Sequence, residues 1–212
     1  DYGIPLYLSH TVTAVEGRER VEGVWVSRVG GDLKPIPGTE KLWECDTLLL
    51  SVGLIPENEL SRAAGIELDP RTGGPIVYEN RETSVPGIFG AGNAVHVHDL
   101  ADFASAEAMI AGKAAALYKP GRTDRKTVSI IAGDGVSYTV PQKIRPSKLD
   151  GAIDVYFRVR SVFDNGVVEI SSEAGTIKQE RGHMSPGEMV HVSLSKSFLD
   201  NSDGITIKAA ER

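Results

Sequence analysis

The sequence predicts two kinds of fold in one chain of 212 residues, an α/β part followed by an all-β part. The α/β part is indicated by an apolar run at residues 45–53, which suits a strand buried on both faces, and by an alanine-rich helix at 102–117. The all-β part is indicated by seven short strand candidates within about 85 residues, a density typical of an immunoglobulin-like β-sandwich.

Composition excludes several classes of protein. Hydrophobic residues make up 41% and charged residues 25%, which is enough apolar material for a core and excludes disorder as the main state. Asp and Glu number 29 against 23 Lys and Arg, so the net charge is −6, and without a basic run a nucleic-acid partner is not expected. The longest apolar stretches fall short of the roughly 20 residues that cross a bilayer, so no membrane span is expected. The single cysteine, Cys45, favours a reducing, cytoplasmic location.

The first 64 residues are predicted to be mostly strands. β-branched residues in near alternation indicate strands at 4–8, 11–15 and 21–29, and a Gly- and Pro-rich loop follows them. The apolar strand at 45–53 ends in glycine. Pro56 then begins a short helix at 56–64, which Gly65 ends.

Residues 65–118 combine turns, brief strands and one long helix. We expect a turn at 73–75 and strands at 76–78 and 87–90, the second of which runs into Ala91-Gly92-Asn93. Asp102 is the expected N-cap of the helix that ends at 117. The small side chains of this helix allow close approach to a sheet or a ligand.

A polar linker with Pro and Gly is expected at residues 119–126, where the sequence changes from a pattern with helices to one of short strands. Gly133-Asp134-Gly135 is predicted to be a tight hairpin turn. The seven predicted strands of the all-β part are 128–132, 136–140, 152–160, 167–171, 176–180, 189–194 and 205–208.

The most specific motif is the run from Thr83 to Asn93, which ends in Ile88-Phe89-Gly90-Ala91-Gly92-Asn93. It resembles the second flavin-binding motif of the pyridine nucleotide-disulfide oxidoreductase family, a group of flavoproteins with two dinucleotide-binding domains. In that family a strand reaches the flavin, a glycine lets the backbone pass close to it, and an acidic side chain then bonds a ribitol hydroxyl. The resemblance implies FAD contacts by Gly92 and by Asn93, which replaces the acid. A Rossmann fingerprint is a poor competitor, because Val95 stands where a third small residue is needed.

Two further segments match the family in the correct order. Residues 45–56 resemble its strand-Gly-x-x-Pro segment, which returns the chain from the NAD(P)H-binding domain to the FAD-binding domain. The family also points a helix N-terminus at the flavin N1 and O2 atoms, which implies contacts by Asp102, Phe103 and Ala104. The alternative for this helix is an ordinary packing helix rich in alanine.

His96-Val97-His98-Asp99 has three interpretations: a metal site, a loop that lines the flavin ring, or a surface loop. The remaining histidines are scattered, no third cluster completes a ligand set, and no metal is expected. Cys45 has no partner cysteine, so the resemblance is to members of the family that lack a CxxC pair.

Together these observations predict a partial two-dinucleotide-binding-domain flavoprotein followed by the β-sandwich. Residues 1–53 are interpreted as the end of an NAD(P)H-binding domain, 54–118 as the C-terminal part of an FAD-binding domain, and 127–212 as the sandwich. Both Gly-rich Rossmann turns are missing from the sequence, so the chain is expected to be a fragment, inactive alone. Its parent would pass hydride between nicotinamide and flavin, with FAD as cofactor and a nicotinamide nucleotide and a partner oxidoreductase subunit as the implied partners. No catalytic residue is identified.

Two alternatives remain open. One is a non-catalytic module whose sandwich docks to a partner subunit or to the rest of the chain. The other is a small enzyme that uses His96, His98 and Asp99.

Overall fold

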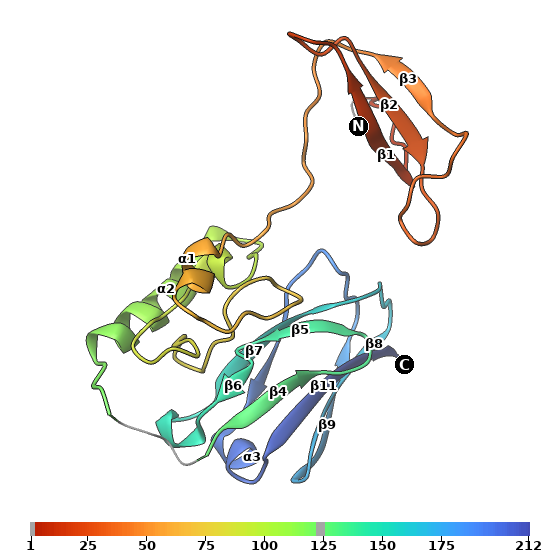
Figure 1. Ribbon diagram of the computed structural model, residues 1–212. Coiled ribbons are helices and arrows are strands. Elements are labelled where there is room, and N and C mark those ends of the chain that lie inside the picture. Colours follow the sequence, from red (N-terminus) through yellow and green to blue (C-terminus); the bar gives the residue numbers. More distant parts are fainter. Residues whose placement is uncertain (1–2, 122–125) are drawn as a thin grey trace. The chain divides into compact units, whose positions relative to one another are not determined.

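The structure is a computed structural model that describes residues 3–121 and 126–212 (Figure 1). The chain divides into two compact units, residues 1–53 and 54–212, which are described separately below. Of the expected linker at 119–126, residues 122–125 lie outside the described residues.

The first unit is a three-stranded antiparallel sheet with the order β1-β2-β3. Its strands are β1 (His10–Glu16), β2 (Gly23–Arg28) and β3 (Lys41–Glu44). The strands expected at 11–15 and 21–29 are present as β1 and β2, and β3 was not predicted. The strand expected at 4–8 is wrong: this segment has no ladder partner among the described residues, and Pro5 has no N–H to give to one.

The apolar run at 45–53 does not form the expected buried strand. It contains no strand, and its side chains are open to solvent, with Leu49 89% and Val52 87% exposed. A strand buried on both faces needs neighbouring strands and covering layers. None of the described strands pairs with this run, so the prediction was wrong.

The second unit begins with helices and turns. Helix α1 (Glu59–Ala63) follows Asn58 and ends before Gly65, whose positive φ of 73° suits glycine. The 3₁₀ turn η1 (Gly92–Ala94) precedes helix α2 (Ala101–Ala116). The strands expected at 76–78 and 87–90 are wrong, since these segments make only isolated bridges.

The predicted N-cap of helix α2, Asp102, is wrong. The cap is Leu100, whose side chain makes no capping hydrogen bond, and Asp102 is the second residue of the helix. An aspartate inside the first turn still interacts favourably with the positive end of the helix.

Residues 126–212 are mostly sheet, and all seven expected strands are present. One sheet has the order β10-β7-β5, and the other has the order β6-β4-β11-β8-β9, in which β4 and β11 run parallel. The strands are β4 (Val128–Ala132), β5 (Val136–Val140), β6 (Lys143–Ile144), β7 (Ile153–Val159), β8 (Gly166–Ser172), β9 (Gly175–Arg181), β10 (Val190–Leu194) and β11 (Gly204–Glu211). Strand β6, the 3₁₀ turn η2 (Pro146–Lys148) and helix α3 (Lys196–Asp200) were not predicted.

The hairpin predicted at Gly133-Asp134-Gly135 is wrong, because β4 and β5 belong to different sheets. The turn instead carries the chain from one sheet to the other. Gly135 has a φ of +75°, and a Cβ at this position would lie 1.9 Å from the carbonyl oxygen of Ala209 on β11. A glycine is therefore required by close backbone contact.

Both sheets contribute to one hydrophobic core. Alternate residues of the strands point inward, as in β7, where Val155, Phe157 and Val159 are buried. Leu199 of helix α3 closes one end of the core, and Ser195 caps that helix by accepting a hydrogen bond from the Phe198 N–H. Full burial of such side chains contributes roughly 1.5–3 kcal/mol each, so the shared core holds the two sheets together.

Polar contacts join the two halves of the second unit. Gln142 accepts a hydrogen bond from the Val77 N–H at 3.0 Å and donates one to Asp69 at 3.1 Å. Arg145, just after β6, pairs with the buried carboxylates of Glu79 and Glu82. These contacts connect residues 54–118 with the β structure that follows.

Candidate functional site

The run from Thr83 to Asn93, which resembles a flavin-binding motif, ends in the turn η1. Gly92 has a φ of +68°, a left-handed conformation that favours glycine. A Cβ added to it would lie 3.9 Å from the Cβ of Ala104, so η1 and the first turn of α2 are adjacent. The structure thus brings three of the predicted site residues together: Gly92, Asn93 and Ala104.

The other two predicted residues, Asp102 and Phe103, lie on the first turn of α2, and both are exposed. The backbone N–H groups of Phe103 and Ala104 are bonded to the carbonyl of Leu100. Among the described residues, the N–H groups of Ala101 and Asp102 have no partner, and no side chain caps the helix. Free N–H groups at the positive end of a helix attract negative charge or electron-rich oxygen.

The side-chain amide of Asn93 is half used by the protein. Its Oδ1 accepts a hydrogen bond from the His98 backbone N–H at 3.1 Å. In the part of the chain that the structure describes, nothing bonds to its Nδ2, and the residue is exposed. Asn93 therefore offers an N–H donor to a ligand oxygen.

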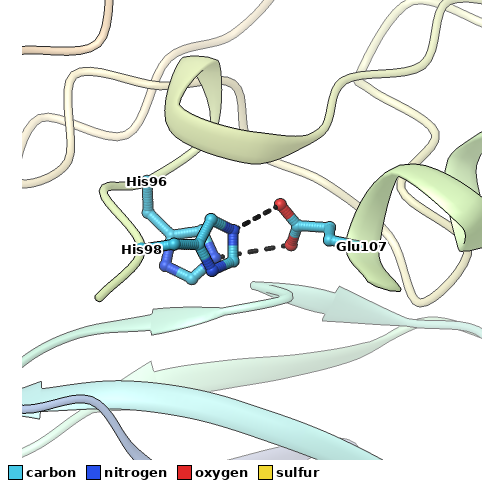
Figure 2. A group of neighbouring side chains, drawn as sticks. All are labelled: His96, His98 and Glu107. Atoms are coloured by element: carbon cyan, nitrogen blue, oxygen red, sulfur yellow. Dashed lines mark hydrogen bonds and ion pairs between the residues drawn. The ribbon is translucent and has the colours of Figure 1, made fainter. Parts of the chain in front are cut away.

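Glu107, in the middle of α2, was missed by the sequence analysis. Its side chain is only 3% exposed, and its two oxygens are surrounded by four donors, as Figure 2 shows in part. The donors are Arg81 Nε at 2.8 Å, Gly92 N at 2.8 Å, His98 Nε2 at 3.0 Å and His96 Nε2 at 3.4 Å. Burial alone would raise the pKa of Glu107, but the hydrogen bonds from His96 and His98 and the charge of Arg81 outweigh burial and lower the pKa well below its usual range.

The partners of Glu107 differ in their surroundings. Arg81 was also missed; it has a φ of +69° and a buried side chain that reaches Glu107. His96 is fully buried, and its Nδ1 has no hydrogen-bond partner among the residues that the structure describes. Burial lowers the pKa of His96 despite the nearby carboxylate, so this ring is neutral at pH 7.

His96, His98 and Glu107 are residue types that bind zinc, and their ligand atoms lie within 4.8 Å of one another. However, each oxygen of Glu107 already accepts from two donors, which fills the roughly four acceptor positions of a carboxylate. The Arg81 cation at 2.8 Å already neutralises the charge of Glu107. The arrangement is that of a hydrogen-bond network, and the absence of a metal stays a prediction.

The loop that carries the two histidines is held by the all-β part. Asp99 forms an ion pair with Arg158 of β7 and accepts a hydrogen bond from the Met189 N–H at 2.6 Å. Arg158 also donates to the carbonyl of Val97 at 3.1 Å and to the hydroxyl of Tyr138 at 3.1 Å. The loop from His96 to Asp99 is therefore fastened on both sides, to α2 and to β7.

Comparison with known proteins identifies relatives for the first part of the chain. A family model described as pyridine nucleotide-disulphide oxidoreductase matches residues 1–108. An NADH oxidase from Methanocaldococcus jannaschii is 27% identical over 127 residues, which cover 60% of this chain and 25% of that protein. An NADH oxidase from Streptococcus pneumoniae is 32% identical over 99 residues, 47% of this chain and 18% of the relative. A component of alkyl hydroperoxide reductase from Xanthomonas campestris is 33% identical over 99 residues, 45% of this chain and 17% of the relative.

The chain thus spans a quarter or less of the length of these relatives. Within residues 3–121 and 126–212, no helix has the length and apolarity needed to cross a membrane. Since the family model covers residues 1–108 of 212, the chain belongs to the pyridine nucleotide-disulphide oxidoreductase family.

Proposed function

We propose that this chain is the C-terminal portion of an FAD-dependent, NAD(P)H-linked oxidoreductase and that it contributes the ribitol contact to the flavin site. The observation that supports this most strongly is the Gly92–Asn93 turn, which lies against the N-terminus of α2 with hydrogen-bond donors left over. In this proposal residues 1–53 end an NAD(P)H-binding domain, 54–118 end the FAD-binding domain, and 127–212 form an immunoglobulin-like sandwich.

The residues present fit the flavin part of FAD. Gly92 has no side chain to keep a ligand away from its backbone. Of the described residues other than its chain neighbours, only the small Ala104 lies within 4 Å of a Cβ added at this position. Asn93 Nδ2 can donate to an oxygen of the ribitol chain. At the helix end, the N–H groups of Ala101 and Asp102 have no partner within residues 3–121 and 126–212. When bound, FAD supplies the site that takes or gives the hydride of the nicotinamide.

The role of this chain in the reaction is then binding and electrostatic orientation. Asn93 fixes the ribitol chain, and the backbone N–H groups of Ala101 and Asp102 at the N-terminus of α2 favour an electron-rich oxygen of the flavin. The exposed ring of Phe103 offers apolar contact on the same turn. Cys45 is free and has no partner cysteine, so electrons in this proposal pass without a disulfide pair. A single cysteine and a nicotinamide co-substrate favour the cytoplasm as the compartment.

The docking alternative is supported in one form only, in which the β structure docks to the rest of its own chain. Arg145 and Arg158 reach from the strand region to Glu79, Glu82 and Asp99. In this view the sandwich, residues 127–212, stabilises residues 54–118 by packing against them, and docking and cofactor binding are functions of one protein.

The test is FAD binding by the parent protein that contains this chain, measured by flavin fluorescence quenching. Asn93→Leu keeps the approximate side-chain volume but removes the donor, so the FAD dissociation constant should rise about 3- to 10-fold, the loss expected for one hydrogen bond. Asn165→Leu is the matched control, because Asn165 is exposed in the all-β part.

We expect the 212-residue chain alone to retain little or no flavin, since it has no pyrophosphate-binding turn. A parent protein without flavin, or equal affinities for the Asn93 and Asn165 variants, would contradict the proposal. A yellow chain that holds FAD by itself would contradict its fragment character.

A further inference from the structure

We propose that Glu107 is a positioning residue for the Gly92–Asn93 turn and that it determines which atoms of Asn93 face a ligand. The carboxylate approaches this turn from the middle of α2, one turn before the buried Ala111. The effect of Glu107 on FAD binding rests on the function proposed above, whereas its effect on the geometry of the turn does not.

A closed ring of contacts ties both sides of Asn93 to one carboxylate oxygen. Glu107 Oε2 accepts the Gly92 N–H at 2.8 Å, just before Asn93, and it contacts His98 Nε2 at 3.0 Å. The backbone N–H of His98 in turn donates to Asn93 Oδ1 at 3.1 Å. This bond turns the amide oxygen of Asn93 toward His98 and takes one of its two acceptor positions, so the N–H₂ group is the part of the side chain left fully open to a ligand.

The other carboxylate oxygen of Glu107, Oε1, connects this closed set of contacts to the interior of the protein. Glu107 Oε1 accepts from Arg81 Nε at 2.8 Å, and both side chains are almost fully buried. The charged pair is therefore shielded from water. In the interior its hydrogen bonds are stronger than at the surface, and its geometry is more strictly held. His96 packs beside it, 4.3 Å from His98 between ring centroids (Figure 2).

Only a carboxylate satisfies this arrangement. Arg81 Nε approaches one oxygen of Glu107 and the Gly92 N–H approaches the other, so both positions must accept. A glutamine has the same shape but a single acceptor oxygen. In Glu107→Gln, either Arg81 or Gly92 must face an N–H₂ group, and the turn loses one of its fixed points.

The first experiment uses the 212-residue chain without FAD and measures amide hydrogen exchange by NMR. In Glu107→Gln the N–H of Gly92 should exchange at least about tenfold faster, as expected for the loss of a charge-assisted hydrogen bond. The N–H of His98 should also exchange faster, because its hydrogen bond to Asn93 Oδ1 depends on the position of the turn. The matched control is Glu180→Gln on β9, where the side chain is 70% exposed and pairs only with Arg212 among the described residues. Unchanged exchange at Gly92 and His98 would overturn the inference.

If Glu107→Gln fails to fold, His98→Phe provides the same test, since it leaves the buried pair of Arg81 and Glu107 in place. The amide at position 98 should then exchange faster, while that of Gly92 stays protected by Glu107. Equal protection at position 98 in this variant and in the wild type would overturn the inference.

The second experiment uses the parent flavoprotein and measures FAD affinity and the visible circular dichroism of the flavin. Glu107→Gln should raise the FAD dissociation constant by up to about the 3- to 10-fold expected for loss of the Asn93 contact and should change the flavin dichroism, with the β-sheet signal unchanged. A wild-type parent without flavin would refute the proposed function but not the result of the exchange experiment. Faster exchange with unaltered FAD affinity and dichroism would overturn the role of Glu107 toward the ligand.

Discussion

Replacement of Arg145 by methionine should destabilise the second unit strongly. Its guanidinium donates to Glu79 at 3.0 Å, to Glu82 at 2.7 Å and to Asn80 at 2.8 Å, and it lies 4.2 Å from the ring centre of Tyr78. Burial alone would lower the pKa of Arg145, but hydrogen bonds to the carboxylates of Glu79 and Glu82 and their charges raise it.

The magnitude follows from the burial of the two carboxylates. The side chains of Glu79 and Glu82 are 4% and 10% exposed, so Arg145→Met leaves two buried charges without their cation. Removal of one partner from a buried pair costs about 3–5 kcal/mol. Two backbone N–H groups remain bonded to these carboxylates, from residue 145 and from Gly87, which places the expected loss near the lower end, at about 3 kcal/mol.

Urea unfolding followed by far-ultraviolet circular dichroism measures this loss. Both tryptophans, Trp25 and Trp43, lie in the first unit, so tryptophan fluorescence reports on the other part of the chain and should not change. Arg212→Met is the matched control: Arg212 and its partner Glu180 are both 70% exposed, and loss of such a pair costs about 0–1 kcal/mol. A loss below about 1 kcal/mol for Arg145→Met would refute the claim that buried ion pairs join the two halves of this unit.

Two other perturbations test the surroundings of the site. Because burial lowers the pKa of His96 below its ordinary 6.5, the unfolded chain takes up a proton first as the pH falls, and stability should decline below about pH 6.5. His96→Phe should reduce the slope of unfolding free energy against pH between about 7 and 5; a slope equal to that of the unsubstituted chain would contradict the buried, neutral ring. Gly74→Ala should destabilise by about 1–3 kcal/mol, because its Cβ would lie 1.9 Å from the Val95 carbonyl oxygen. Gly182→Ala, whose Cβ would have no atom within 4 Å, should change the free energy of unfolding by no more than about 0.5 kcal/mol. Similar thermal midpoints for the two variants would show that the backbone at Val95 can move to make room for the Cβ at little cost.

The all-β part was predictable because its signal is local. A period of two along 152–160 places Val155, Phe157 and Val159 on one face, and the structure buries that face. The way in which strands pair is not local, and the expected hairpin at 133–135 failed because β4 and β5 join different sheets. The apolar run at 45–53 failed for a related reason: apolar composition is compatible with a buried strand, but neighbouring strands must supply the burial.

The motif residues could be recognised from a local signal in the sequence, whereas the hydrogen-bond network that supports them could not. Gly92 was named from the resemblance of the motif in which it stands, and the structure gives this residue a φ of +68°, a conformation that favours glycine. Glu107 could not be predicted, because its partners come from residues 81, 92, 96 and 98, which only the fold brings together. Apart from Asp102 in the first turn, Glu107 is the one carboxylate among the alanines of α2, and on a helix such a residue usually faces solvent.

A crystal structure of the FAD-bound parent protein would show whether Asn93 and the N-terminus of α2 contact the flavin. We predict a ribitol oxygen within about 3.2 Å of Asn93 Nδ2, with the flavin ring next to the free N–H groups of Ala101 and Asp102. FAD bound elsewhere, with Asn93 Nδ2 open to solvent, would rule out a flavin contact by this turn.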